Sequence, residues 1–134
     1  MVEFSEVLPL FYVSIPVIGL LVWYKIRSSQ QIFKMKEKGL SIAAVGAAAR
    51  SNTLLNYYKL DSSIIDFITD SSEHKIGKYT PGSCIPIFDD AALKDKDPDV
   101  AIILSWNIGK YLVDKIQSIN PNMKVITIGE KELL

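Results

Sequence analysis

The sequence predicts a layered α/β domain with a mostly parallel sheet, and three observations support this fold class. From Leu40 onward, short apolar runs alternate with segments of helical periodicity, as they do in β-α units. The most apolar run, Val100 to Trp106, is continuously hydrophobic, which is typical of a central strand covered on both faces. The chain has 134 residues, of which 49% are hydrophobic, so it can bury the core of one domain.

The alternation predicts the elements in chain order. The expected strands are Leu40 to Val45, Ile64 to Thr69, Ile85 to Ile87, Val100 to Trp106 and Lys124 to Gly129. The expected helices are Asn52 to Leu60, Asp89 to Lys94 and about Ile108 to Ile119. Because Pro86 cannot donate to a central ladder, the third strand is expected to be short or to lie at an edge.

Residues 1–38 are expected to form a unit of their own before the domain at 39–134. Val7 to Tyr24 carries no charge and is just long enough for a membrane span. Acidic residues precede this stretch and basic residues follow it, which would place the domain on the cytoplasmic side. A helix that packs on the domain or on a partner is the alternative. The polar, helix-compatible connector at 28–38 would end at Gly39 as its C-cap.

Composition excludes several classes of function. The formal net charge is zero, so no general attraction to nucleic acid is expected and any anion site must be local. The only cysteine is Cys84, which rules out an internal disulfide and a cysteine zinc cluster, and suits a reducing compartment. His74 is the only histidine, so a histidine-rich metal site is also excluded. We therefore expect no metal or cofactor bound by this chain alone.

The first candidate site is the junction between the first expected strand and helix. The tiny side chains of Gly46, Ala47 and Ala48 would let a phosphate approach the backbone N–H groups at the start of a helix. Arg50 adds a planar, permanently charged donor at the same place. Close packing of a helix on the sheet, with no ligand, would require the same small residues.

Two further strand ends would share a rim with this junction, because parallel strands end at the same edge. Asp70 follows the second strand at a spacing that suits an acid for ribose hydroxyls, or it caps Ser71-Ser72 or pairs with Lys75. Trp106 offers a flat face for a base or sugar, or it packs at the rim. Asn107 would contact ligand or cap the next helix.

The loop from His74 to Ile87 is too particular to be explained by turns alone. Together with Gly46-Ala47-Ala48, the run from Asn52 to Asn56 and Trp106-Asn107, it resembles the carboxyl-terminal domain of sugar C-methyltransferases, over roughly Lys36 to Gly129. The resemblance implies a Rossmann-like, three-layer domain that helps to enclose a nucleotide-sugar. The implied ligand rim draws on all these motifs: Gly46, Ala47, Asn52, Lys75, Gly77, Lys78, Pro81, Gly82, Trp106 and Asn107.

In this rim Lys75 and Lys78 would supply cations for a diphosphate, while Gly77 and Gly82 would let the loop turn tightly. A solvated loop whose lysines pair with acids is the alternative. The sequence also departs from the family pattern. Family members usually have an aromatic residue before the glycine, a lysine and a glycine in place of Arg50-Ser51, and an acid soon after the Trp-Asn pair, where this chain has Ile108-Gly109-Lys110.

In that family a zinc-binding domain and an S-adenosylmethionine-binding domain do the chemistry, and neither set of motifs occurs in this sequence. We therefore expect a substrate-side domain that binds a nucleotide or nucleotide-sugar beside a separate methyltransferase subunit and does not catalyse alone. One alternative is a small module that binds NAD or NADP through Gly46 and Asp70. Another is a ligand-free scaffold held at a membrane by Val7 to Tyr24.

Overall fold

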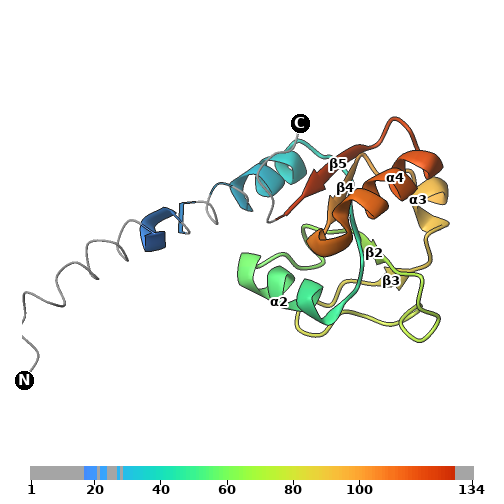
Figure 1. Ribbon diagram of the computed structural model, residues 1–134, viewed down its shortest axis with the longest axis horizontal. Coiled ribbons are helices and arrows are strands. Elements are labelled where there is room, and N and C mark those ends of the chain that lie inside the picture. The colour runs from blue at the N-terminus through green and yellow to red at the C-terminus, as the bar shows by residue number, and fades with distance from the viewer. Residues whose placement is uncertain (1–16, 21, 24–26, 28, 129–134) are drawn as a thin grey trace, which may run out of the picture.

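The computed structural model describes residues 17–20, 22–23, 27 and 29–128, and within them five parallel strands form one sheet (Figure 1). The strands are β1 (Ile42–Val45), β2 (Phe67–Thr69), β3 (Ile87–Phe88), β4 (Val100–Ile103) and β5 (Lys124–Thr127). Their order across the sheet is β3-β2-β1-β4-β5, so the sheet grows in opposite directions from β1 and β4. This is the strand order of Rossmann-like folds, and it confirms the predicted fold class.

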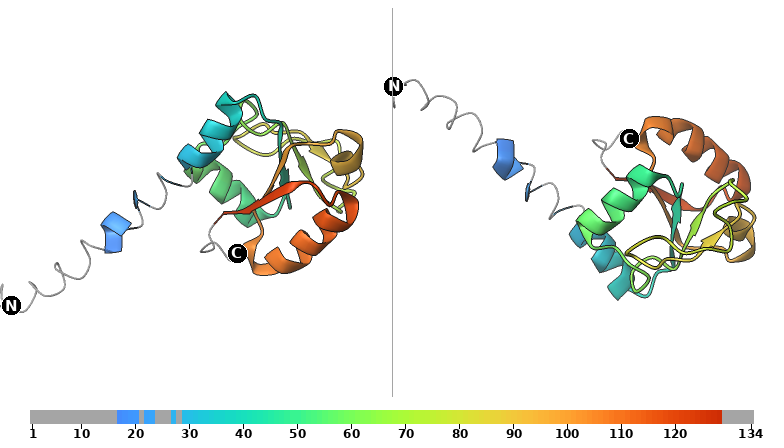
Figure 2. Two further views of the ribbon diagram at one scale, coloured as in Figure 1. Left: turned by 90° about the horizontal axis from the view of Figure 1, so that it is seen from above. Right: turned by 90° about the horizontal axis from the view of Figure 1, so that it is seen from below.

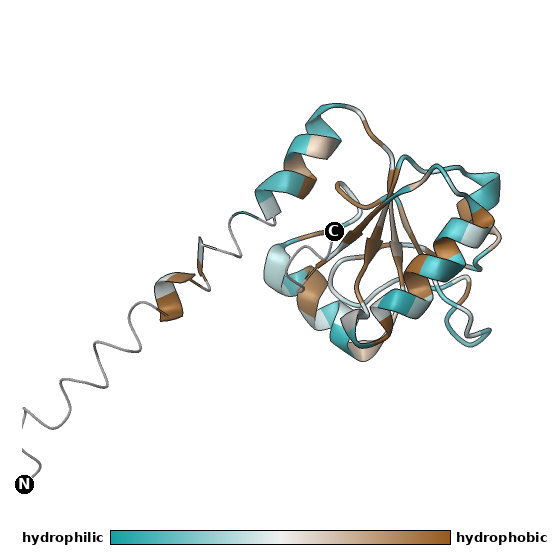
Figure 3. Cartoon of the chain, turned by 45° about the horizontal axis from the view of Figure 1, so that its top comes forward, coloured by the Kyte–Doolittle hydropathy of each residue, from teal (hydrophilic) through white to brown (hydrophobic). Residues whose placement is uncertain are grey.

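Helices cover both faces of the sheet, which makes three layers (Figure 2). The helical segment 29–37 and α2 (Ala49–Tyr58) lie on one face, and α3 (Ala92–Asp95) and α4 (Gly109–Ile119) on the other. Successive residues of a strand point to opposite faces, so Ala44 joins the core beneath α2 and Val45 the core beneath α4. Figure 3 shows the resulting apolar strands between helices whose outer faces are polar.

The helical segment 29–37 contributes to this core. Ile32 and Met35 are buried among residues of β1, α2 and β4. The segment ends as predicted at Gly39, whose φ is +78°. The Gly39 N–H donates to the Lys36 carbonyl at 2.9 Å and the Leu40 N–H to the Met35 carbonyl at 3.3 Å. These two bonds form a Schellman motif, which fixes the direction in which β1 begins.

Most of the apolar stretch predicted at Val7 to Tyr24 lies outside the described residues. Where it is described, its large apolar side chains are exposed: Val17, Ile18, Leu20, Val22 and Trp23. Among the helices that the structure describes, none is both long enough and apolar enough to cross a membrane.

Element boundaries differ from the prediction in two places that matter for the site. The helix α2 begins at Ala49 and not at the predicted Asn52. Its first turn contains no large apolar side chain, so the apolar spacing of the sequence does not reveal this start. The strand β4 ends at Ile103 and not at Trp106, and the 3-10 helix η1 (Trp106–Ile108) then leads into α4. The predicted edge position of the third strand is confirmed: β3 pairs only with β2, and Pro86 makes an isolated bridge to Tyr79.

Candidate functional site

The carboxyl ends of β1, β2 and β4 lie together at one rim of the sheet. The N–H of Gly46, after β1, donates to the carbonyl of Thr69 at the end of β2, at 2.9 Å. On the other side of β1, a Cβ built on Gly46 would lie 2.7 Å from Ser105 Oγ. Gly46 also has a φ of +93°, so both backbone conformation and close approach require glycine here. The three strand ends therefore share one rim, as expected for parallel strands.

The carboxylate of Asp70 occupies part of the small-residue junction. Its Oδ2 accepts the Ala47 N–H at 2.9 Å and lies 3.4 Å from Lys75 Nζ, and its Oδ1 accepts the Ser72 N–H at 2.8 Å. The two structural roles considered for Asp70, capping the Ser71-Ser72 loop and pairing with Lys75, thus occur together. The anion at the Ala47 N–H is the protein's own carboxylate, whereas α2 itself has no side-chain cap and no acid in its first turn.

These bonds stabilise the charged form of Asp70. Burial alone would raise the pKa of this carboxyl, but the N–H groups of Ser72 and Ala47 and the charge of Lys75 outweigh it and hold the pKa below its usual value. The unfolded chain therefore binds more protons than the folded one as the pH falls toward and below about 3.9. The stability that Asp70 contributes is present above that pH and is lost as the pH falls through the folded-state pKa.

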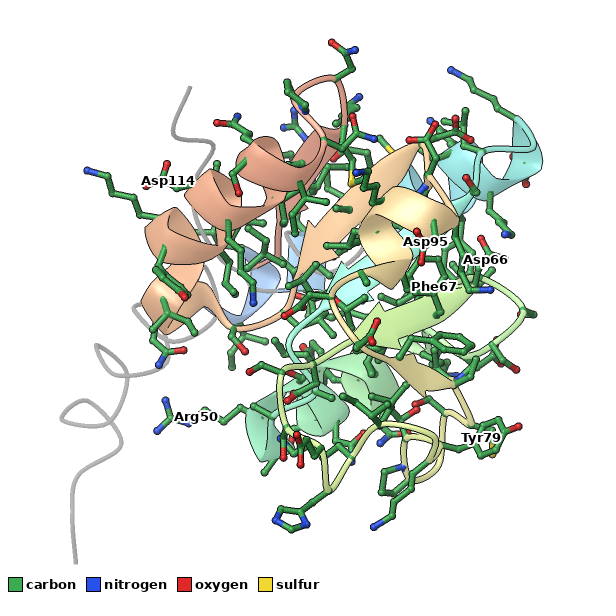
Figure 4. All side chains as sticks on the ribbon, turned by 90° about the vertical axis from the view of Figure 1, so that its right-hand side faces the viewer. Arg50, Asp66, Phe67, Tyr79, Asp95 and Asp114 are labelled. Atoms are coloured by element: carbon green, nitrogen blue, oxygen red, sulfur yellow. The ribbon has the colours of Figure 1, made fainter. Side chains whose placement is uncertain are left out.

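We expect the unfolding free energy of Asp70→Asn to fall less steeply toward acid pH than that of the original chain. Urea unfolding of both proteins between pH 3 and pH 7 measures this, and the difference in unfolding free energy should shrink toward low pH. The matched control is Asp114→Asn, since the side chain of Asp114 extends into solvent from α4 (Figure 4). A difference between Asp70→Asn and the original chain that is constant with pH would contradict the assignment.

A cavity of about 300 Å³ opens between the start of α2 and the loop that precedes β3. One wall consists of small and amide-bearing residues at the start of α2: Ala47, Ala48, Ala49 and Asn52. The opposite wall comes from the loop and carries two lysines: Lys75, Lys78, Tyr79, Thr80 and Pro81. The volume is at the lower end of the range for small-molecule sites. Two lysines and the amino end of α2, which has no side-chain cap, thus contribute to the lining of this space.

A buried pair of hydroxyl groups holds the loop wall in place. Thr80 and Ser83 are each 4% exposed, and their hydroxyl oxygens lie 2.6 Å apart. Thr80 Oγ1 accepts the Ile85 N–H at 2.9 Å, while the Thr80 N–H donates to the Ile85 carbonyl at 3.0 Å. The loop is tied to β3 as well, since the Ile87 N–H donates to the Lys78 carbonyl. The sequence alone does not reveal the role of Thr80 or Ser83, because threonine and serine in a loop carry no signal of burial.

We expect Thr80→Val to lower the unfolding free energy by about 2 kcal/mol, because it leaves the buried Ile85 N–H and Ser83 hydroxyl without their shared partner. Chemical denaturation measures the loss. Thr80→Ser keeps the hydroxyl and is the matched control, with an expected loss of about 1 kcal/mol or less for one methyl group. Equal losses in the two variants would show that the hydroxyl pair does not hold the loop.

Other predicted site residues take different positions. Arg50 is exposed, does not line the cavity, and extends away from the body of the domain (Figure 4). The ring of Tyr79 also points outward from its loop. Gly82, with a φ of +80°, lets the loop approach α2, because a Cβ there would lie 2.8 Å from Asn56 Oδ1. Gly77 also has a positive φ, as a tight turn requires.

The Trp106-Asn107 pair lies in η1, on the far side of β1 from the cavity. The side chain of Trp106 lies outside what the structure describes. Asn107 is exposed and does not cap α4, whose N-cap residue is Ile108 and makes no side-chain cap bond. Asn107 is not among the residues that line the cavity.

Within the described part of the chain, no group of three or more His, Cys, Asp or Glu residues could hold a metal ion. The described residues form a single strand-glycine-helix junction, and Asp70 already holds its Ala47 N–H. We assign no methyl-transfer step to the described residues.

Comparison with known proteins relates most of this chain to one domain family. Residues 24–127 match the model of the C-methyltransferase C-terminal domain. The C-methyltransferase NovU of Streptomyces niveus is 33% identical over 76 residues, which make up 57% of this chain and 18% of that protein. The aligned part is thus less than a fifth of the relative's length. Because the family model spans most of the chain, this protein belongs to the family of C-methyltransferase C-terminal domains.

Proposed function

We propose that this chain binds a nucleotide-sugar, with its diphosphate in the cavity between the start of α2 and the 75–81 loop. The observation that carries the proposal is that the uncapped amino end of α2 and a loop bearing Lys75 and Lys78 line the same space of about 300 Å³. Ammonium groups and helix N–H groups are the donors that phosphate oxygens prefer. Membership of a C-methyltransferase domain family supports a sugar-linked ligand, and methyl transfer itself would be carried out outside this domain.

Binding of NAD or NADP at the same junction is the weaker alternative. In dinucleotide sites the pyrophosphate lies against the backbone N–H groups of the glycine-rich turn. Here the Gly46 N–H donates to Thr69 and the Ala47 N–H to Asp70, so neither donor is open to a ligand. The carboxylate of Asp70 would also repel a pyrophosphate at that position.

Thermal unfolding of the full chain with and without ligand tests the proposal. We expect dTDP-glucose, UDP-glucose or GDP-mannose to raise Tm, since a ligand at a hundred times its Kd contributes about 2.7 kcal/mol. NAD, NADP and inorganic phosphate at the same concentration serve as comparisons. No shift with any nucleotide-sugar at millimolar concentration would contradict the proposal, and a shift with NAD alone would favour the alternative.

Attachment to a membrane is a second proposal, and it rests on the amino-terminal segment. The exposed side chains of Val17, Leu20 and Trp23 give this segment an uncovered apolar surface, and the guanidinium of Arg27 lies 5.1 Å from the Trp23 ring. Amphipathic segments rich in basic and aromatic residues bind at bilayer interfaces. We expect the full chain to float with vesicles of phosphatidylcholine and phosphatidylglycerol. Leu20→Asp should abolish flotation, and a chain that stays in the aqueous fraction would contradict this proposal.

A further inference from the structure

We infer that Asp70 makes the cavity selective between ligands that differ by one charge, favouring a nucleotide-sugar over the corresponding free nucleoside diphosphate. The inference rests on the proposed function. It gives Asp70 a role in specificity that none of the roles considered from the sequence included. The carboxylate would act through Lys75 and the Ala47 N–H, both of which it contacts.

The geometry places Asp70 directly behind the cavity wall. Its Oδ2 is bonded to the N–H of Ala47 and is paired with Lys75, and both of these residues line the cavity. The side chain is only 12% exposed, whereas that of Lys75 is 43% exposed and has room to turn toward a ligand. A low pKa keeps Asp70 charged at neutral pH. A fixed negative charge therefore lies within hydrogen-bond reach of one wall of the site.

The charges of the cavity and of the two ligands explain the expected difference in affinity. Among the described residues, Lys75 and Lys78 are the ionisable side chains that line the cavity besides Tyr79, and Asp70 is the carboxylate that pairs with one of them. A nucleotide-sugar carries two negative charges, one on each phosphate. The two lysines can pair with these. A free nucleoside diphosphate carries a further charge on its terminal phosphate above a pKa of about 6.

Among the described residues that line the cavity, no cation is left to pair with that third charge. This charge would lie near Asp70 and would lose its hydration without gaining an ionic partner. A sugar ester removes this charge. The carboxylate should therefore penalise the free diphosphate more than the ester, and a site of this kind would retain the sugar-linked form in the presence of the free nucleotide.

Calorimetric titration of the full chain at pH 7.5 tests the inference with three ligands: dTDP, its terminal methyl ester and dTDP-glucose, with the uridine series in parallel. The methyl ester lacks the third charge but has no sugar, so it separates charge from sugar contacts. We expect the original chain to bind the methyl ester about fivefold more tightly than dTDP, a ratio of the size expected for one like charge at a partly solvated distance. Asp70→Asn should reduce this ratio toward one, mainly by strengthening binding of dTDP.

Glu73→Gln is the matched control, because Glu73 is an exposed acid in the same loop and pairs with neither lysine within the described part of the chain. It should leave the ratio unchanged. If the ester and the free diphosphate bind the original chain equally well, the inference is wrong while the proposed function stands. If none of the ligands binds, the proposed function fails and the inference fails with it. The comparison in the original chain can overturn the inference even if Asp70→Asn does not fold.

Discussion

Replacing both Lys75 and Lys78 with glutamine is expected to weaken binding of a nucleotide-sugar about 30-fold. Hydrogen bonds to charged groups contribute about 1.5–3 kcal/mol each, and the exposure of these lysines reduces that contribution. Glutamine is one atom shorter than lysine but keeps a hydrogen-bond donor, so the loss reports mainly on the charge. Calorimetry with dTDP-glucose or UDP-glucose measures it.

Lys124→Gln is the matched control for this pair. Lys124 is also exposed, but it lies at the amino end of β5, at the opposite end of the strands from the rim. We expect it to leave the affinity unchanged. If Lys124→Gln and the double variant weakened binding equally, the lysines of the cavity would have no special role, and the diphosphate site would have to be sought elsewhere.

Gly46→Ala is expected to lower the unfolding free energy by about 3 kcal/mol. This value combines the strain of a left-handed backbone conformation with the cost of a steric clash. The φ of +93° is unfavourable for any residue with a Cβ, and that atom would meet Ser105 Oγ at 2.7 Å. Chemical denaturation measures the loss. The variant would also move the end of β1 away from that of β4.

Two further variants separate the strain from the clash. Gly39→Ala has a similar positive φ but an added Cβ meets nothing within 4 Å, so its expected cost is the strain alone, about 1–2 kcal/mol. Combining Gly46→Ala with Ser105→Ala removes the hydroxyl that causes the closest contact and should recover part of the loss. No recovery in the double variant would mean that Ser105 does not set the spacing at this point.

The fold could be predicted largely from hydrophobic patterning. The apolar runs at Leu40 to Val45 and Val100 to Trp106 have the composition of strands that are covered on both faces. Both strands lie inside the sheet, with a neighbour on each side. The predicted ends were less accurate, because the last residues of an apolar run can leave the ladder and remain buried. Leu104 is an example: it follows β4 and is completely buried.

The partners of the site residues could not be predicted in the same way. Sequence spacing indicated that Gly46 and Asp70 share a rim, but not that the Asp70 carboxylate turns back to the Ala47 N–H. The position of Arg50 depended on where α2 begins. With the helix starting at Ala49, the residues that face the sheet are Ser51, Leu55 and Tyr58, and Arg50 is left on the solvent side. A shift of three residues in the helix start thus changes which cation is available to a ligand.

The loop from His74 to Ile87 was identified only through its resemblance to a family, since its residues follow no periodic pattern. The structure supplies the physical reason for its shape. A buried Thr80-Ser83 hydroxyl pair and two positive-φ glycines fold the loop against α2 and β3. Such long-range hydrogen bonds arise from tertiary contacts and leave no local signal in a single sequence.

Amide chemical shifts of the full chain, recorded while dTDP-glucose or UDP-glucose is titrated in, test the central claim most directly. The account predicts saturable shifts concentrated at the cavity walls, in residues 47–52 and 75–81, with little change at β5. Saturable shifts elsewhere on the domain, or none at millimolar ligand, would contradict it.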